Sequence, residues 1–144
     1  AEEIAAILEE EKKKVVIVAL VDTLEYLKKG GRISSAVAFA GGLLSIKPVV
    51  AIKEGGIELI GKARGSKQGN NLLRELIAKS NGIDFEEPFM LAYSGLSDKL
   101  LQKYMKDSAE IWEGSAKELP VCTVGCAIGA HVGPGAIAVA FFEK

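Results

Sequence analysis

The sequence predicts a two-layer α/β domain over residues 1–144, in which helices pack against a mixed six-stranded sheet. Three observations support this prediction. A chain of 15.2 kDa corresponds to one domain and can bury about two-thirds of its unfolded surface. Apolar runs of strand length alternate with segments of helical period. A hairpin requires antiparallel pairing, whereas strand–helix–strand connections favour parallel pairing.

The first third of the chain contains three predicted helices and one strand. Residues 2–13 have apolar side chains at i, i+3 and i+4, which indicates a helix. The continuous apolar run 15–21 is typical of a strand buried on both faces. Asp22 and Glu25 predict a capping box that opens a helix over 22–29, which Gly30-Gly31 ends. A further, very apolar helix is expected over 35–46.

The rest of the chain predicts five strands and two helices. The segment around Glu54-Gly55-Gly56 is typical of a hairpin turn. Pro48 is expected at a strand entry, where a missing N–H is tolerated. The expected strands are 48–52, 57–65, 88–94, 119–126 and 136–142, and the expected helices are 67–79 and 97–107.

The charge balance argues against several classes of partner. Lys+Arg total 18 and Asp+Glu total 19, so whole-domain attraction to nucleic acid or to an anionic membrane is not expected. No apolar run reaches the ~18 residues of a membrane span, so stable membrane insertion is not expected either. The N-terminus has no signal-peptide pattern, and we expect a cytoplasmic protein. Because the chain opens without Met in a helical pattern, we expect it to be part of a longer protein.

Metal, cofactor and nucleotide chemistry have little support in the sequence. The single histidine excludes any metal site that needs two imidazoles, and we expect neither a metal nor a cofactor. The glycines do not spell a phosphate-binding loop or a dinucleotide fingerprint. Cys122 and Cys126 are expected on one strand, about 13 Å apart and too far for a disulfide, as small buried side chains.

Three features are candidates for function. His131 is expected in a Gly-rich loop between two strands, either as a structural residue, as a ligand contact or, least favoured, as a catalytic base. Lys28, Lys29 and Arg32 form a basic patch that either complements the helix dipole or contacts an anionic partner. The apolar segment 34–46 is either a buried packing helix or the wall of an apolar cavity.

These residues resemble the DegV family of bacterial fatty-acid-binding proteins. The resemblance rests on DTLEYLKKGGRISSAVAFAGGLLSIKPVVAIKEGGIELIGKARG and on the ending IGAHVGPGAIAVAFF, and it covers about residues 15–142. It implies two α/β domains in a protein about twice this length, with this chain as the C-terminal one. It also implies an acyl chain in an apolar tunnel between and within the domains.

The resemblance implies roles for individual residues and a partner. The implied ligand-binding residues are His131, Gly133, Phe39, Ala40, Leu43 and Leu44, and Ala36 belongs to the same wall. Some family members present the fatty acid to a fatty acid kinase, which implies that Arg32, with Lys28 and Lys29, faces that kinase. The binding protein is then not an enzyme, and no catalytic residue is expected. The Thr and Ser that hold the carboxylate in the family belong to the N-terminal domain, which this sequence lacks.

Two other functions compete with fatty-acid binding. One is a protein-interaction or regulatory domain that uses the basic patch and binds no lipid. The other is a small hydrolase that uses His131, for which Cys126 is the only nucleophile close in sequence. The expected burial of Cys126 argues against the hydrolase.

Overall fold

The computed structural model describes residues 1–33, 46–115 and 118–144. The apolar segment predicted as a helix over 35–46 therefore lies almost entirely outside the described residues, and so do Ala36, Phe39, Ala40, Leu43 and Leu44. The elements are α1 (Glu2–Glu11), a 3₁₀ turn (Lys12–Lys14), β1 (Val15–Leu20), α2 (Glu25–Lys29), β2 (Ile46–Lys53), β3 (Gly56–Arg64), α3 (Gly65–Lys79), β4 (Met90–Tyr93), α4 (Lys99–Asp107), α5 (Ala109–Trp112), β5 (Val121–Thr123), α6 (Cys126–Val132) and β6 (Ile137–Phe142).

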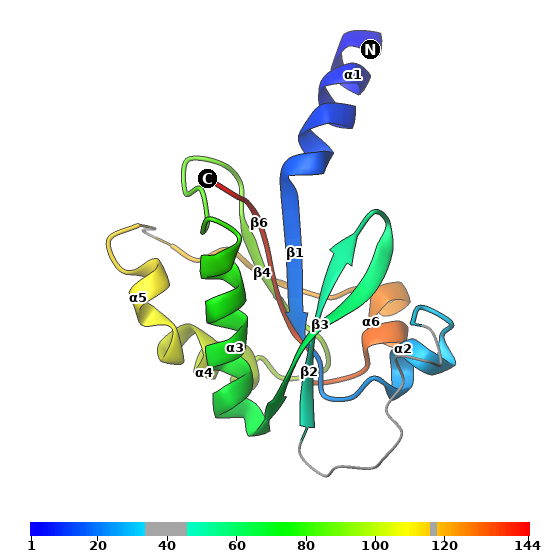
Figure 1. Ribbon diagram of the computed structural model, residues 1–144, viewed down its shortest axis with the longest axis vertical. Helices are drawn as coiled ribbons and strands as arrows, with labels where there is room; N and C mark the ends of the chain where they lie inside the picture. The colour runs from blue at the N-terminus through cyan, green and yellow to red at the C-terminus, as the bar shows by residue number, and fades with distance from the viewer. Residues whose placement is uncertain (34–45, 116–117) are drawn as a thin grey trace.

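The six strands form one open, mixed sheet, which confirms the predicted fold class. Their order is β3-β2-β1-β6-β4-β5, and β1 and β6 lie at its centre (Figure 1). Every neighbouring pair is antiparallel except β4 and β5, which are parallel. The β2–β3 hairpin turns at Glu54 and Gly55, both with positive φ, as the sequence predicted. Pro48 lies two residues inside β2, just beyond the last β1–β2 residue pair, Leu20 and Val49.

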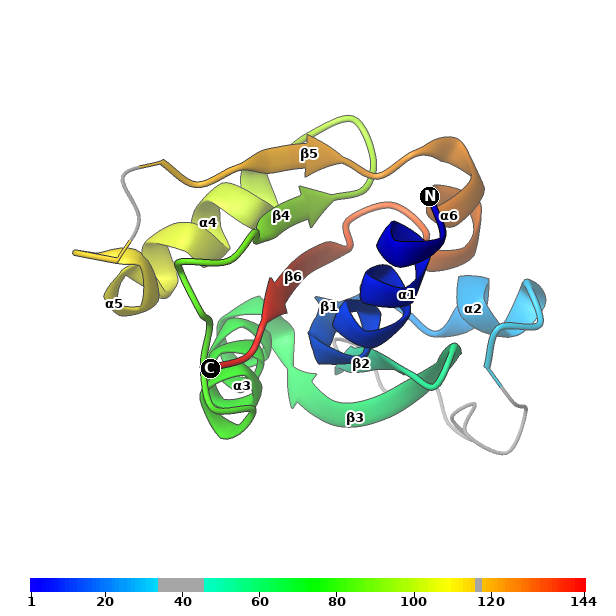
Figure 2. The same ribbon diagram turned by 90° about the horizontal axis from the view of Figure 1, so that it is seen from above.

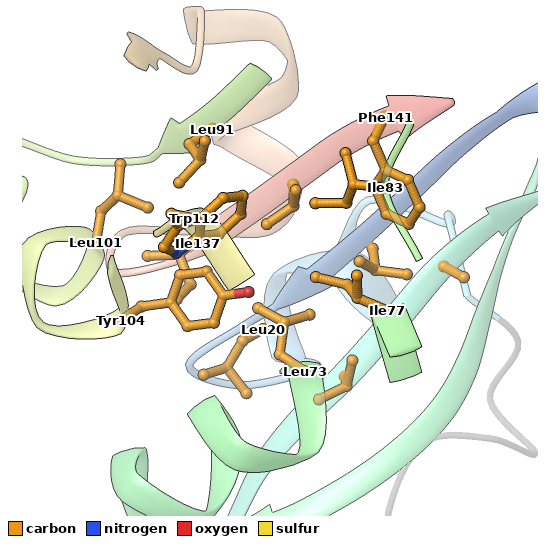
Figure 3. Packing of buried hydrophobic residues seen from close by; sticks show 14 residues of the cluster. Leu20, Leu73, Ile77, Ile83, Leu91, Leu101, Tyr104, Trp112, Ile137 and Phe141 are labelled. Atoms are coloured by element: carbon orange, nitrogen blue, oxygen red, sulfur yellow. The ribbon is translucent and has the colours of Figure 1, made fainter. Parts of the chain in front are cut away.

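Helices α3, α4 and α5 cover one face of the sheet and enclose the main core (Figures 1 and 3). Alternate residues of β1, β4 and β6 point into this core, among them Leu20, Leu91 and Val139. Leu73 of α3 and Leu101 of α4 meet them from the helices, and both are fully buried. This layer carries the aromatic packing of the domain, with Trp112 against the rings of Phe85, Phe89 and Tyr104.

The opposite face of the sheet is covered only at one end among the described residues. There α2 and α6 lie side by side (Figures 1 and 2). A second, smaller apolar cluster holds this end together and includes Val21, Leu24, Leu27 and Ile33. The sequence predicted a strand buried on both faces over 15–21, and the structure provides a second helix layer over only part of the second face.

Helix α1 projects from the sheet and contributes nothing to the core (Figure 1). None of its residues is buried, and its apolar stripe stays exposed at Ile4 (62%), Ile7 (55%) and Leu8 (60%). Ion pairs such as Lys14–Glu11 line its last turn. Among the described residues, no helix combines the length and hydropathy needed to cross a membrane.

The predicted capping box at Asp22 is wrong. Helix α2 begins at Glu25, and no side chain caps it from the N-cap residue Leu24. The backbone N–H of Glu25 donates to Thr23 Oγ1 at 3.2 Å, while the Asp22 carboxylate pairs with Lys47 at the start of β2. The Asp22 side chain, which the local pattern assigned to the helix N-terminus, therefore forms a long-range ion pair with Lys47 instead.

The predicted strand over 119–126 is also wrong at its C-terminal end. The structure has the three-residue β5, then a turn, then α6, which begins at Cys126. Both cysteines are exposed free thiols, not buried side chains. The run from 124 to 132 is apolar and contains two glycines, a composition that does not distinguish a helix turn from a loop.

Candidate ligand-binding site

One end of the sheet gathers those of the singled-out residues that the structure describes. The register places Leu20 of β1 and Tyr93 of β4 opposite Ile137 of β6, and Tyr93 beside Thr123 of β5. The carboxyl ends of β1, β4 and β5 therefore lie together with the start of β6. Helices α2 and α6, which follow β1 and β5, are placed at this same end (Figure 2).

His131 lies in the last turn of α6, not in the loop that the sequence predicted. Its side chain is half-buried, and Nδ1 is inaccessible to solvent without a hydrogen-bond partner in the described part of the chain. The ring packs on Gly30, where it occupies the space that a Cβ would need. A buried ring nitrogen without a partner has unused capacity for one hydrogen bond, as donor or acceptor according to its tautomer.

Gly133 ends α6 in a conformation that favours glycine. Its φ is +74°, and the Tyr26 ring of α2 occupies the space where a Cβ would stand. Gly133 is buried, and its carbonyl accepts a hydrogen bond from Ser94 Oγ. The α2 and α6 helices therefore contact each other at two glycines: the His131 ring of α6 packs against Gly30, and the Tyr26 ring of α2 packs against Gly133.

The predicted basic patch lies on the surface at the end of α2. Lys28, Lys29 and Arg32 are all exposed. Lys29 forms an ion pair with Glu25 at 2.7 Å, which raises the pKa of the Lys29 ammonium. Arg32 Nη1 donates to the Gly30 carbonyl at 2.9 Å. Gly30 therefore contacts both side chains: its carbonyl accepts a hydrogen bond from Arg32, and its Cα packs against the His131 ring. These contacts bring together two motifs that lie far apart in the sequence.

A row of small residues crosses the second face of the sheet from this site. Directly paired positions share a face, and the row runs through Ala19 of β1, Ala138 of β6, Ala92 of β4 and Cys122 of β5. Larger apolar residues flank it, and of these Met90 is 41% exposed. Sequence reasoning missed this surface because strands apolar on both faces give no period-2 alternation to mark one of them.

Two cavities adjoin this end of the sheet. A groove of about 580 Å³ has Gly31, Arg32 and Ile33 on one side and Ile57 and Leu59 of β3 on the other. The groove is therefore lined by apolar side chains together with the charged Arg32 and Glu58.

The second cavity, of about 200 Å³, lies between α3 and α4 and is lined by Asp22, Lys47, Asn70 and Lys103, among others. Its lysines already pair with Asp22 and Asp107, so its charges are compensated within the chain.

The geometry gives little support to hydrolysis or metal chemistry. Cys126 and His131 are five residues apart on α6, which at 3.6 residues per turn places them about 140° apart around the helix. That arrangement disfavours a thiol–imidazole pair, although Cys126 is exposed where the sequence predicted burial. In the described ranges 1–33, 46–115 and 118–144, no three His, Cys, Asp or Glu side chains are placed to hold a metal ion.

The comparisons with known proteins agree with the fold and place the chain in a family. A family model described as an uncharacterised protein of the DegV family matches residues 1–144, so the chain belongs to the DegV family. A DegV domain-containing protein of Caldanaerobacter subterraneus subsp. tengcongensis is 32% identical over 148 residues, covering 99% of this chain and 50% of the relative. The chain thus spans about half the length of that relative.

Two solved structures share the fold. The first concerns fatty-acid binding of a DegV family protein from Thermus thermophilus, with a TM-score of 0.76 and 29% identity, covering 99% of this chain and 50% of that chain. The second is the Streptococcus pneumoniae fatty acid kinase B3 protein loaded with linoleic acid, with a TM-score of 0.82 and 20% identity over 99% of this chain and 50% of that one.

Proposed function

We propose that this chain is the C-terminal half of a two-domain protein that binds a long-chain fatty acid. The observation that carries the proposal is the half-buried imidazole of His131 at the end of an apolar sheet face, whose Nδ1 has no hydrogen-bond partner among the described residues. A carboxylate supplies the hydrogen-bond partner that this imidazole lacks, and the acyl chain supplies apolar contacts. The structural similarity to the DegV family protein from Thermus thermophilus, whose structure concerns fatty-acid binding, supports this ligand class.

The large exposed surface of the chain supports the proposal that a second domain packs against it. The chain exposes 9033 Å² of surface, whereas a compact monomer of 15.2 kDa exposes roughly 7,100 Å². The apolar stripe of α1 and the small-residue row of the sheet both belong to this surface. We propose that the half present in the longer relatives covers it and closes the tunnel around the acyl chain. The wall formed by Phe39, Ala40, Leu43 and Leu44 remains a prediction from the sequence.

We further propose that the protein presents the fatty acid and does not transform it. In this scheme a fatty acid kinase acts on the bound carboxylate, and the exposed Lys28, Lys29 and Arg32 contact that kinase. The shared fold with the Streptococcus pneumoniae fatty acid kinase B3 protein is compatible with this role. We also propose a cytoplasmic location, because free exposed thiols at Cys122 and Cys126 suit a reducing compartment.

Native mass spectrometry with lipid extraction tests the proposal. The protein carrying both halves is purified without added lipid and measured before and after denaturation. We expect a mass excess that denaturation releases and that the extract identifies as a long-chain fatty acid. A protein that carries no lipid and takes none up from added fatty acid contradicts the proposal. The 144-residue chain measured alongside is expected to bind poorly, since half of the carboxylate site is absent from it.

A further inference from the structure

We propose that Ser94 is a positioning residue for the carboxylate site, and that it acts through His131. The proposal rests on the proposed function, since it concerns the same site. Ser94 follows β4 and is 2% exposed, so its side chain lies inside the domain. It makes four hydrogen bonds to the turn between α6 and β6, which joins His131 to the sheet.

Two of these bonds use the backbone of Ser94 and two use its hydroxyl. The Ser94 N–H donates to the Ala136 carbonyl at 2.9 Å, and the Gly135 N–H donates to the Ser94 carbonyl at 3.0 Å. The hydroxyl donates to the Gly133 carbonyl and accepts from the Ala136 N–H at 2.9 Å. A hydroxyl can fill both roles at once, whereas an alanine at this position leaves two buried backbone groups without partners.

The Ser94 hydroxyl therefore holds the end of α6. Gly133 caps this helix, with its N–H donating to the Gly129 carbonyl at 2.9 Å, and His131 lies in the turn that this bond closes. If the Gly133 carbonyl loses its donor, the helix end is free to shift relative to Gly30, against which the His131 ring packs. The consequence is a displaced imidazole in a domain whose main core is untouched, because that core lies on the other face of the sheet.

A double-mutant cycle in the two-domain protein tests this. Dissociation constants are measured for a long-chain fatty acid and for the alcohol with the same tail. Ser94→Ala is expected to weaken fatty-acid binding about tenfold and alcohol binding less than about twofold, since the carboxylate depends more on His131. In a His131→Ala background, Ser94→Ala is expected to change fatty-acid affinity by less than about twofold, because the residue it positions is gone. Equal losses for acid and alcohol, or additive losses in the cycle, overturn the proposal.

Ser108→Ala is the matched control. Ser108 is also a buried serine, but it lies between α4 and α5 under the opposite face of the sheet. Its loss is expected to leave the affinities for both ligands unchanged. If Ser94→Ala does not fold, Ser94→Cys keeps a donor and acceptor of the same shape, slightly larger, but weakens both hydrogen bonds, and the same cycle is run with it.

A ligand-free measurement separates this proposal from the proposed function. His131 is the only histidine of the chain, so its imidazole gives one set of NMR signals in the 144-residue protein. Ser94→Ala is expected to shift these signals and to speed hydrogen exchange at the Ala136 amide. Unchanged signals and exchange overturn the positioning role whatever the lipid data show. Shifted signals in a protein whose two-domain form binds no fatty acid support the positioning role and contradict only the proposed function.

Discussion

The Nδ1 atom of His131 occupies the space that a Cβ at residue 30 would need, so α6 and α2 fit together only with glycine at that position. The same glycine accepts a hydrogen bond from Arg32 through its carbonyl. Gly30 has an ordinary helical backbone, with φ −77° and ψ −3°, so its requirement is steric and not conformational. The residue therefore offers a direct way to move His131 without changing it.

Gly30→Ala is expected to displace the His131 ring and to weaken fatty-acid binding about as much as His131→Ala does. Gly129→Ala is the matched control, because a Cβ at residue 129 of α6 meets no atom within 4 Å. That control is expected to bind as wild type and to be more stable by up to about 1 kcal/mol, owing to the higher helix propensity of alanine. Calorimetric titration and thermal unfolding of both variants check this. Wild-type affinity in a folded Gly30→Ala protein would show that the contact does not position the imidazole.

His131→Ala is expected to weaken fatty-acid binding by roughly tenfold to a hundredfold. A hydrogen bond to a charged group contributes about 1.5–3 kcal/mol, and about 1.4 kcal/mol corresponds to a factor of ten. Binding is not abolished, because the tail buries much more area than the carboxylate. The measurement is calorimetric titration of the two-domain protein with one fatty acid. Equal affinities for wild type and variant would leave His131 with a structural role only.

Arg32→Ala is expected to keep fatty-acid binding and to lose transfer of the lipid to the kinase. The Arg32 side chain is exposed and donates a local hydrogen bond to the Gly30 carbonyl, so its removal leaves the core intact. Lys79→Ala removes an exposed charge from the end of α3, on the opposite face of the sheet, and serves as the control. Lipid binding and kinase-dependent phosphorylation are measured on both variants. Loss of lipid binding with kinase affinity retained would reverse the role of Arg32.

Gly133→Ala is expected to destabilise the domain for two separable reasons. A non-glycine residue at φ +74° and ψ 175° costs on the order of 1–3 kcal/mol, and the new methyl also overlaps the Tyr26 ring. Tyr26→Ala in the same protein should remove the overlap and leave the backbone cost. Urea unfolding of the two single variants and the double variant measures each part. A double variant as stable as Tyr26→Ala alone would show that the backbone at residue 133 adapts without cost.

The stability of the domain is expected to fall in acid partly through Asp107. Hydrogen bonds from the Lys103 ammonium and from Asn70 Nδ2, the latter at 2.8 Å, lower the pKa of this carboxyl. A lowered folded-state pKa stabilises the native state above the unfolded pKa, and this contribution disappears as the pH falls through the folded value. Asp107→Asn should therefore destabilise more at pH 7 than at pH 2 in urea unfolding. The same difference at both pH values would contradict this assignment.

The sequence by itself determined the fold class and most elements. The β2–β3 hairpin, α3 and β6 occur close to their predicted ranges, because each carries a local signal such as the Glu54-Gly55 turn or a helical period of leucines. Helix α6 had no such signal, and its three-residue neighbour β5 is too short for a pattern to appear. The predicted loop position of His131 is wrong, because the residue lies in α6, and its role in ligand binding stays a prediction.

Only the tertiary structure decided which residues meet. Three contacts join segments that lie far apart in the chain. They are the ion pair of Asp22 with Lys47, the packing of His131 on Gly30, and the hydrogen bonds of the Ser94 hydroxyl to Gly133 and Ala136. Local spacing carries information about contacts within a turn or along one element, where the backbone itself sets the distance. Contacts across the sheet depend on the order of the strands and on their register. The register is set by the burial of one face of the sheet, which is a property of the whole domain and not of any one segment. The residue types of the site were therefore visible in the sequence, and their arrangement around Gly30 was not.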